Sequence, residues 1–171
     1  MKNLILSLLW LTALITVFLY LQGILPLAPY QPGQLSTEEI LAVINQTRQQ
    51  HGLKELTQNQ LLTKAAEAKA ANLFEEQYFQ HTSHSGKIFS DFIKNSNYSA
   101  NRLGENLAKN ITQAKVLIQS WLDSAPHREN LLNPYFQEIG LSVLIGKLDH
   151  KKTTLVVSLF GEPKEKAKEN F

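Results

Sequence analysis

Residues 139–160 contain two short apolar runs, Ile139-Gly-Leu-Ser-Val-Leu-Ile145 and Thr154-Leu-Val-Val-Ser-Leu-Phe160. Both runs are rich in β-branched and other apolar residues, and the segment between them, from Lys147 to Thr153, is polar. Two such runs joined by a polar turn are typical of a β-hairpin. The sequence therefore predicts two antiparallel strands near the C-terminus.

Two capping motifs lie well before this hairpin in the sequence. Ser36-Thr-Glu-Glu39 and Thr57-Gln-Asn-Gln60 both have a hydroxyl residue followed, three positions later, by Glu or Gln. In a capping box these two side chains bond each other's backbone N–H groups and begin a helix. We expect the first helix to stop at Gly52 and the second, which is rich in alanine, to run to about Gln77.

Two further helices are expected before the hairpin. Residues 88–94 fit a short helix with apolar residues on one side, and Thr112 is a candidate cap for a fourth helix, which Pro126 would interrupt. Residues 78–86 and 95–102 are polar and are expected to be loops. About four helices followed by a hairpin predict an α+β domain in which helices pack on a small antiparallel sheet.

Composition restricts the kinds of protein that the chain can be. Of 171 residues, 43% are hydrophobic and 19% are charged, which is typical of a globular protein. The 17 Lys and Arg residues nearly balance 15 Asp and Glu residues, so nothing in the charge predicts a nucleic-acid partner. No cysteine is present, which excludes disulfides, thiolate catalysis and Cys-ligated zinc.

The N-terminal region is apolar and carries almost no charge. Residues 4–21 hold no charged side chain, and Lys2 is the only charged side chain before them. Such a segment nearly spans a hydrocarbon core, so we expect a membrane anchor, with a cleaved signal peptide as the alternative. Lys2 would keep the N-terminus inside and place the domain outside the cytoplasm. The expected organisation is an anchor or signal at 1–23, a Pro/Gly linker at 24–35, one domain at 36–162 and a charged tail at 163–171.

Several stretches taken together resemble the CAP superfamily, the group of cysteine-rich secretory proteins, antigen 5 and pathogenesis-related 1 proteins. The stretches span about residues 36–162, and their order and spacing carry the resemblance, which is to the short bacterial members. They are Ile44-Asn-Gln-Thr-Arg48, Leu61 to Ala70, Phe79-Gln-His-Thr-Ser83, Gly104-Glu-Asn-Leu-Ala108, Trp121-Leu-Asp-Ser124, His127-Arg-Glu-Asn-Leu-Leu-Asn-Pro134, Phe136-Gln-Glu-Ile-Gly140 and Leu159-Phe-Gly161. The resemblance implies an α-β-α sandwich with a cleft lined by two histidines and acidic residues.

Carried onto this sequence, the resemblance implies a site made of His81, Glu105 and His127. Many members have a further glutamate three residues after the tryptophan, and this position holds Ser124 here. The acidic set is therefore incomplete, which puts chemistry that depends on all four residues in doubt. We take His81, Glu105 and His127 as candidate catalytic residues and His81 and His127 as candidate metal ligands.

Two neutral imidazoles can bind zinc or a similar divalent cation, but a tight structural zinc site has four ligands. A metal at His81 and His127 would thus be weakly held and open to solvent, with water or Glu105 completing its shell. Glu105 would orient a histidine or act on a water molecule; alternatively it fixes its turn by accepting backbone N–H groups. In the alternative without metal, the histidines only form hydrogen bonds within a polar cleft.

Other polar residues near these motifs have less specific expected roles. His84, in the segment that holds His81, is a further candidate ligand, with a solvated loop histidine as the alternative, and Arg128 is a candidate to pair with a carboxylate such as Glu138. We expect Asn106 and Asn130 to be structural hydrogen-bonding residues.

The predicted function is a module at the cell envelope that binds a ligand, with or without a metal ion, in the cleft of His81, Glu105 and His127. The first alternative is a metal-assisted hydrolase of envelope peptides or esters, and the second is a lipid-binding module. The expected partners are the membrane, through the N-terminal segment, and a protein, peptide or lipid ligand.

Overall fold

The structure, a computed structural model, describes residues 35–164. The predicted anchor or signal at 1–23 lies outside these residues, as do most of the predicted linker and residues 165–171 of the predicted tail. Among the described residues, no helix is both long enough and apolar enough to cross a membrane.

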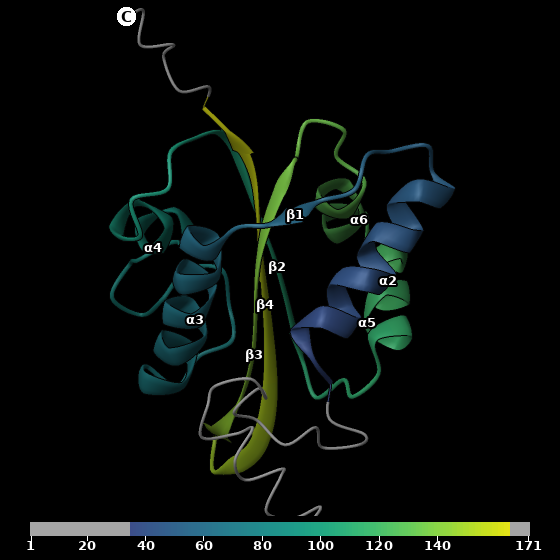
Figure 1. The fold of residues 1–171 in the computed structure, drawn as a ribbon. Helices are drawn as coiled ribbons and strands as arrows, with labels where there is room; N and C mark the ends of the chain where they lie inside the picture. Colours follow the sequence, from purple (N-terminus) through teal and green to yellow (C-terminus); the bar gives the residue numbers. More distant parts are fainter. Residues whose placement is uncertain (1–34, 165–171) are drawn as a thin grey trace, which may run out of the picture. The chain divides into compact units, whose positions relative to one another are not determined.

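Five helices and four strands make up the described part of the chain (Figure 1). The helices are α2 (Thr37–Gln50), α3 (Gln60–Glu75), α4 (Phe89–Asn95), α5 (Ala114–Asp123) and α6 (Ala125–Leu131). The strands are β1 (Thr57–Gln58), β2 (Ala100–Lys109), β3 (Glu138–Leu148) and β4 (Lys151–Pro163).

The strands form one mixed sheet with the order β1-β3-β4-β2. The predicted hairpin is confirmed, because β3 and β4 pair antiparallel from Glu138–Gly161 to Leu148–Lys151. The expectation of a purely antiparallel sheet is wrong, since the two-residue strand β1 pairs parallel with β3. Figure 1 shows three layers, with α3 and α4 on one face of the sheet and α2, α5 and α6 on the other. The α+β class is confirmed, with five helices where about four were expected.

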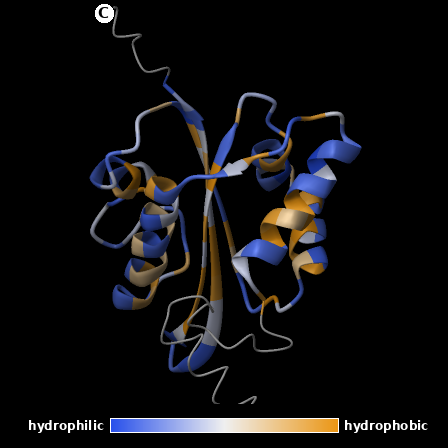
Figure 2. Ribbon diagram, in the orientation of Figure 1, coloured by the Kyte–Doolittle hydropathy of each residue, from blue (hydrophilic) through white to orange (hydrophobic). Residues whose placement is uncertain are grey.

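Each face of the sheet carries its own hydrophobic core. On the central strand β4, Val156 and Phe160 pack toward α2 and α5, whereas Leu155, Val157 and Leu159 pack toward α3 and α4. A strand buried on both faces needs apolar residues at odd and even positions, which explains the nearly continuous apolar run in its sequence. Figure 2 shows the hydrophobic positions gathered along the strands and on parts of the flanking helices.

The helix starts agree with the sequence at one capping box and differ at the other predicted caps. Ser36 caps α2, and its Oγ accepts a hydrogen bond of 3.1 Å from the Glu39 N–H. Thr57 does not cap α3, because its backbone pairs with β3; the cap is Asn59, whose Oδ1 accepts from the N–H groups of Leu61 and Leu62. Thr112 is not the cap of α5 either, because the residue at the N-cap position is Gln113. A hydroxyl pattern alone therefore misplaced two helix starts.

Strand β2 and helix α6 were not expected. Polar residues interrupt the apolar pattern of β2, which nevertheless pairs with β4 from Ala100–Pro163 to Lys109–Leu155. Pro126 lies in the first turn of α6, where its missing N–H leaves no helical hydrogen bond unmade. The predicted interruption at Pro126 is thus the start of a new helix, and this helix lies beside β2.

Candidate functional site

A pocket of about 260 Å³ opens beside strand β2 and brings the three predicted site residues together. Because side chains alternate along a strand, Glu105 lies on the same face of β2 as Leu103 and Leu107, which pack toward α3 and α4. His127 comes from α6 on the other side of the sheet. The lining residues are His81, Phe89, Leu103, Gly104, Glu105, Pro126, His127 and Asn130.

Glu105 is the buried acidic group of this pocket. Its exposed fraction is 5%, and its Oε1 accepts a hydrogen bond of 2.6 Å from Nδ1 of His81. Its second oxygen, Oε2, is buried and finds no hydrogen-bond partner among residues 35–164. A buried carboxylate oxygen without a partner is costly for a fold.

His81 lies on the segment between α3 and α4, and its ring reaches Glu105. A carboxylate only accepts hydrogen bonds, so Nδ1 carries the proton of this bond, and Nε2 is the ring nitrogen with a lone pair in the neutral form. The hydrogen bond to Glu105 raises the pKa of His81 above its ordinary value, while burial and the charge of Lys69 act in the opposite direction. Glu105 therefore both orients the imidazole and favours its protonated form.

His127 is the second imidazole, and its surroundings favour the neutral ring. Nδ1 lies 2.8 Å from Oγ of Ser124, the residue at the position of the absent glutamate. Burial, followed by the charge on His81, lowers the pKa of His127. A hydroxyl can donate or accept, so Ser124 does not select one tautomer of the ring as a carboxylate would.

Two asparagines fasten the two sides of the pocket to each other. Nδ2 of Asn106 donates to the backbone oxygen of His127 at 3.0 Å. Nδ2 of Asn130 donates to the backbone oxygen of Glu105 at 3.0 Å and to Oδ1 of Asn106 at 2.9 Å. These contacts are the structural hydrogen bonds that the sequence predicts, and they tie α6 to the outer edge of β2.

Two contacts that the sequence suggested, one of His84 and one of Arg128, are not formed among the described residues. His84 does not line the pocket; its ring lies against that of Tyr78, with 5.5 Å between the centroids. Arg128 donates from Nη1 to the backbone oxygen of Leu122, and Glu138 accepts instead from the Tyr98 hydroxyl at 2.7 Å. The predicted pairing of Arg128 with Glu138 is therefore wrong.

Lys69 on α3 is a residue of the site region that the sequence did not single out. Its side chain is fully buried, and its Nζ donates to the backbone oxygen of His81 at 3.0 Å. A signal was present in the sequence, because Lys69 lies at helical spacing from Leu62, Ala65 and Leu73 on the face that is expected to be buried. A lysine on such a face is unusual enough to mark a specific partner.

The chemistry available in the pocket comes from two imidazoles in different surroundings and one buried carboxylate. No group of three or more His, Cys, Asp or Glu side chains among residues 35–164 is arranged to hold a metal ion. The pocket can thus offer two imidazole nitrogens to a cation, or a proton donor at His81 beside a neutral ring at His127. The wall of Phe89, Leu103 and Pro126 adds apolar surface to this polar end.

Comparison with known proteins places this fold and these motifs in one family. Residues 41–159 match the CAP family, described as the cysteine-rich secretory protein family. An outer surface protein from Borrelia burgdorferi has a similar structure, with a TM-score of 0.64 and 28% sequence identity. The alignment covers 77% of this chain and 98% of that protein.

Two relatives from Bacillus subtilis strain 168 are similar in sequence. The uncharacterized protein YkwD is 34% identical over 112 residues, which are 64% of this chain and 44% of YkwD. The uncharacterized membrane protein YlbC is 30% identical over 108 residues, which are 63% of this chain and 31% of YlbC. The matched region is thus less than half of either relative. The match over residues 41–159, which contain every pocket residue, shows that this chain belongs to the CAP family.

Proposed function

We propose that this chain is a ligand-binding module of the cell envelope, whose pocket between His81 and His127 takes up a divalent cation such as zinc together with a small polar ligand. The observation that carries the proposal is the convergence of these two imidazoles, from opposite sides of the sheet, on one pocket with the buried carboxylate of Glu105.

The donor set fits a weakly held cation. His81 has the arrangement typical of a metal-binding histidine, in which one ring nitrogen donates to a carboxylate and the other is available to the metal. His127 can offer Nε2 in the tautomer that donates from Nδ1 to Ser124. A cation held by these two rings would supply a positive charge that attracts a carboxylate or carbonyl oxygen of the ligand. Two protein ligands leave most of its coordination positions to water and ligand.

The walls of the pocket also indicate the chemistry of the ligand. Phe89, Leu103 and Pro126 line it together with the histidines, so one side is apolar and the other is polar. A pocket of about 260 Å³ accommodates a small group. We therefore propose a ligand that presents a carboxylate or carbonyl oxygen next to an apolar substituent, as a peptide end does.

Its proposed location outside the cytoplasm, next to a membrane, rests on the apolar segment at residues 4–21 and on the relatives. One similar protein is named an outer surface protein and another a membrane protein. The single positive side chain before the segment favours an orientation with the domain outside.

The experiment that tests the proposal is a calorimetric zinc titration of the full chain in detergent micelles at about pH 7.5, above the ordinary pKa of histidine. We expect weak binding, with a dissociation constant on the order of micromolar or higher because two imidazoles are few ligands. Binding should be lost in the double variant His81→Ala/His127→Ala.

His84→Ala is the matched control, because this histidine belongs to the same segment as His81 but lies outside the pocket. It should bind zinc as the unchanged protein does. Equal binding by the double variant, or no binding by any of the proteins, would remove the metal from the proposal.

A hydrolase is the second candidate, and the presence of Glu105 beside two imidazoles in one pocket favours it, because a carboxylate or a neutral imidazole there could accept a proton from a bound water molecule. Peptide or ester turnover that is lost in Glu105→Gln and in His81→Ala would support this function. Turnover that persists in both variants would exclude it. The lipid-binding alternative stays a prediction of the sequence.

A further inference from the structure

Lys69 is a buried cation close to the site, and ordinary ion pairing does not explain its burial. Its exposed fraction is 0%, and desolvation by the surrounding side chains lowers its pKa. A buried lysine is normally paired with a carboxylate, since an uncompensated ammonium is costly in a low-dielectric interior. Within residues 35–164, Lys69 forms no direct ion pair, and the charges of Glu105 and Glu76 act on its pKa against the effect of desolvation without bonding to the ammonium.

All the acceptors of the Lys69 ammonium lie on the segment that carries His81. Nζ donates to the Tyr78 hydroxyl at 2.9 Å, to the backbone oxygen of His81 at 3.0 Å and to that of Gln80 at 3.4 Å. An ammonium has three N–H donors, so these contacts use its full capacity. Nζ also lies 4.9 Å from the centre of the Tyr78 ring, a cation–π contact that further offsets the loss of water.

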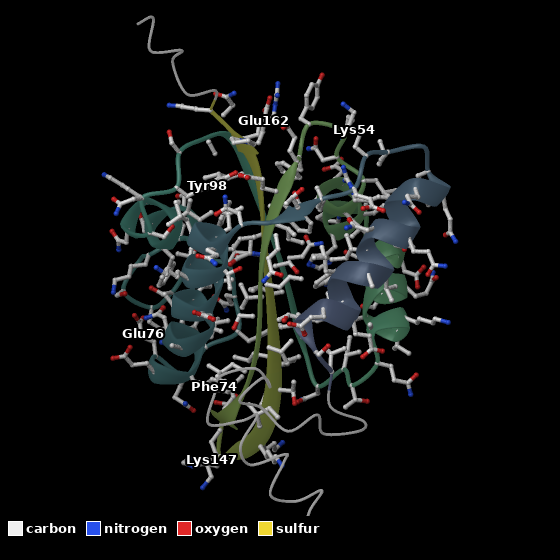
Figure 3. All side chains as sticks on the ribbon, viewed as in Figure 1. Lys54, Phe74, Glu76, Tyr98, Lys147 and Glu162 are labelled. Atoms are coloured by element: carbon white, nitrogen blue, oxygen red, sulfur yellow. The ribbon has the colours of Figure 1, made fainter. Side chains whose placement is uncertain are left out.

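Residues at the C-terminal end of α3 also bind Ser85, at the other end of the segment that carries His81. Asn72 follows Lys69 by three positions on the same side of α3, and Glu76 is the residue that caps the C-terminal end of this helix. The Tyr78 hydroxyl donates to Oδ1 of Asn72 at 2.7 Å, and Nδ2 of Asn72 donates to Oε1 of Glu76 at 2.8 Å. Glu76, labelled in Figure 3, accepts from Oγ and the backbone N–H of Ser85. A continuous chain of hydrogen bonds thus fastens residues 78–85 to α3.

We propose that Lys69 is a positioning residue for the site: its ammonium ties the backbone of His81 to α3 and thereby holds the imidazole against Glu105. His81 has no helix or strand of its own, and its ring is largely exposed, so the backbone contact to Lys69 and the ring contact to Glu105 are what fix it. The inference deepens the proposed function, because it concerns the same pocket, but the position of His81 can be measured without any ligand.

A purely structural role of Lys69 would have a different consequence. If its stem only filled space in the core around Leu73 and Phe92, methionine would replace it with little effect on the position of His81. If it positions His81, methionine removes the ammonium and leaves the two backbone oxygens without a donor. The segment should then open locally while the helices and the sheet stay folded.

The experiment compares Lys69→Met with Lys64→Met, which changes an exposed lysine on the same helix. NMR spectra of the full chain in detergent micelles would report amide hydrogen exchange and the ring Nδ1–H signal of His81. In Lys69→Met we expect exchange of residues 79–85 to speed up at least about tenfold, while β4 keeps its protection. The Nδ1–H signal, which its bond to Glu105 shields from solvent exchange, should broaden or vanish. Lys64→Met should leave both observables unchanged.

Two more variants keep the inference testable if Lys69→Met does not fold. Lys69→Gln is uncharged and its side chain is one atom shorter, so it should lose the bond to the backbone oxygen of His81, and exchange of residues 79–85 should rise in the same way. Lys69→Arg retains a cation with several donors and should restore part of the His81 signal. Normal exchange and an intact His81 signal in folded Lys69→Met, or in Lys69→Gln where Lys69→Met is unfolded, would overturn the inference.

Zinc titration of the same variants separates this inference from the proposed function. If the unchanged protein binds zinc, Lys69→Met should bind it several-fold more weakly than Lys64→Met does. If no protein binds zinc, the proposed metal role is lost, and the NMR comparison still decides whether Lys69 positions His81.

Discussion

Arg48 shows how a single buried side chain organises backbone that is distant in sequence. It is fully buried on α2, and its guanidinium donates to four backbone oxygens, those of Lys54, Leu131, Asn133 and Phe136. The last three of these acceptors lie at the end of α6 and in its connection to β3. Arg48→Met would leave all four carbonyl groups without this donor, and the bonds to Leu131 and Phe136 are buried where water cannot replace them. We expect the free energy of unfolding to fall by at least about 3 kcal/mol, measured by urea denaturation.

The control for this change is Arg102→Met. Arg102 pairs with Glu162 at 2.6 Å, but its side chain is half exposed, and exposed ion pairs stabilise little. We expect a loss of less than about 1 kcal/mol. Similar losses in the two variants would show that the four backbone contacts of Arg48 do not hold the α6–β3 connection.

The residues of the site were predictable only in part. His81, Glu105 and His127 were identified by resemblance, and the structure places them in one pocket. Sequence spacing alone could not pair them, because His81 and His127 come from different layers around β2. Lys69 was missed because helical periodicity indicates that a position is buried but not which distant backbone its side chain binds.

At the scale of elements, the packing of α3 on β3 depends on one glycine. A Cβ atom on Gly140 would lie 2.0 Å from the backbone carbon of Leu62 in α3, so the helix itself would have to move. We expect Gly140→Ala to destabilise the protein by about 2 kcal/mol or more, because backbone cannot rotate out of the way as a side chain can. Thermal unfolding followed by circular dichroism would measure the loss.

Gly146→Ala is the matched comparison on the same strand. Its Cβ atom would meet the side chain of Phe74 at 2.9 Å, and a side chain near the end of a helix can shift by a small amount. Figure 3 shows Phe74 near the end of the sheet where Lys147 lies. We therefore expect a cost of less than about 1 kcal/mol for Gly146→Ala. Equal losses at the two glycines would argue against a rigid contact at Gly140.

The elements that the sequence predicted best are those whose pattern follows from burial alone. Helices α2, α3 and α4 have apolar residues at helical spacing, and the β3–β4 hairpin consists of two apolar runs joined by a polar turn. Strand β2 was missed because its polar residues serve the site: Glu105 reaches His81, and Asn106 bonds the backbone of His127. Strand β1 is only two residues long, and its parallel pairing depends on β3, which comes much later in the chain. Local patterns carry no information about such a partner.

At the scale of the whole molecule, the sheet separates two cores, and the site joins them across the edge strand β2. His81 and Glu105 lie on the side of the sheet that α3 and α4 cover, whereas His127 belongs to the layer of α5 and α6. The two imidazoles are therefore held by different parts of the fold. Because their pKa values shift in opposite directions, their contributions to the stability of the whole protein should change with pH in opposite directions.

For His81, the folded pKa is raised, chiefly by its hydrogen bond to Glu105. Its contribution to stability is then fully present below the ordinary pKa of about 6.5 and is lost as pH rises through the raised value. The difference in unfolding free energy between the unchanged protein and His81→Gln should accordingly be larger at about pH 5.5 than at about pH 9, in urea unfolding at a series of pH values.

For His127, the folded pKa is lowered, first by burial and then by the charge on His81. Its contribution is present above the ordinary pKa of about 6.5 and is lost as pH falls through the lowered value. The difference between the unchanged protein and His127→Gln should therefore shrink as the solution is acidified, opposite to the trend for His81→Gln. His84→Gln, outside the pocket, serves as the control. If the His81 and His127 differences changed with pH in the same direction, the two rings could not occupy the unlike surroundings that the pocket gives them.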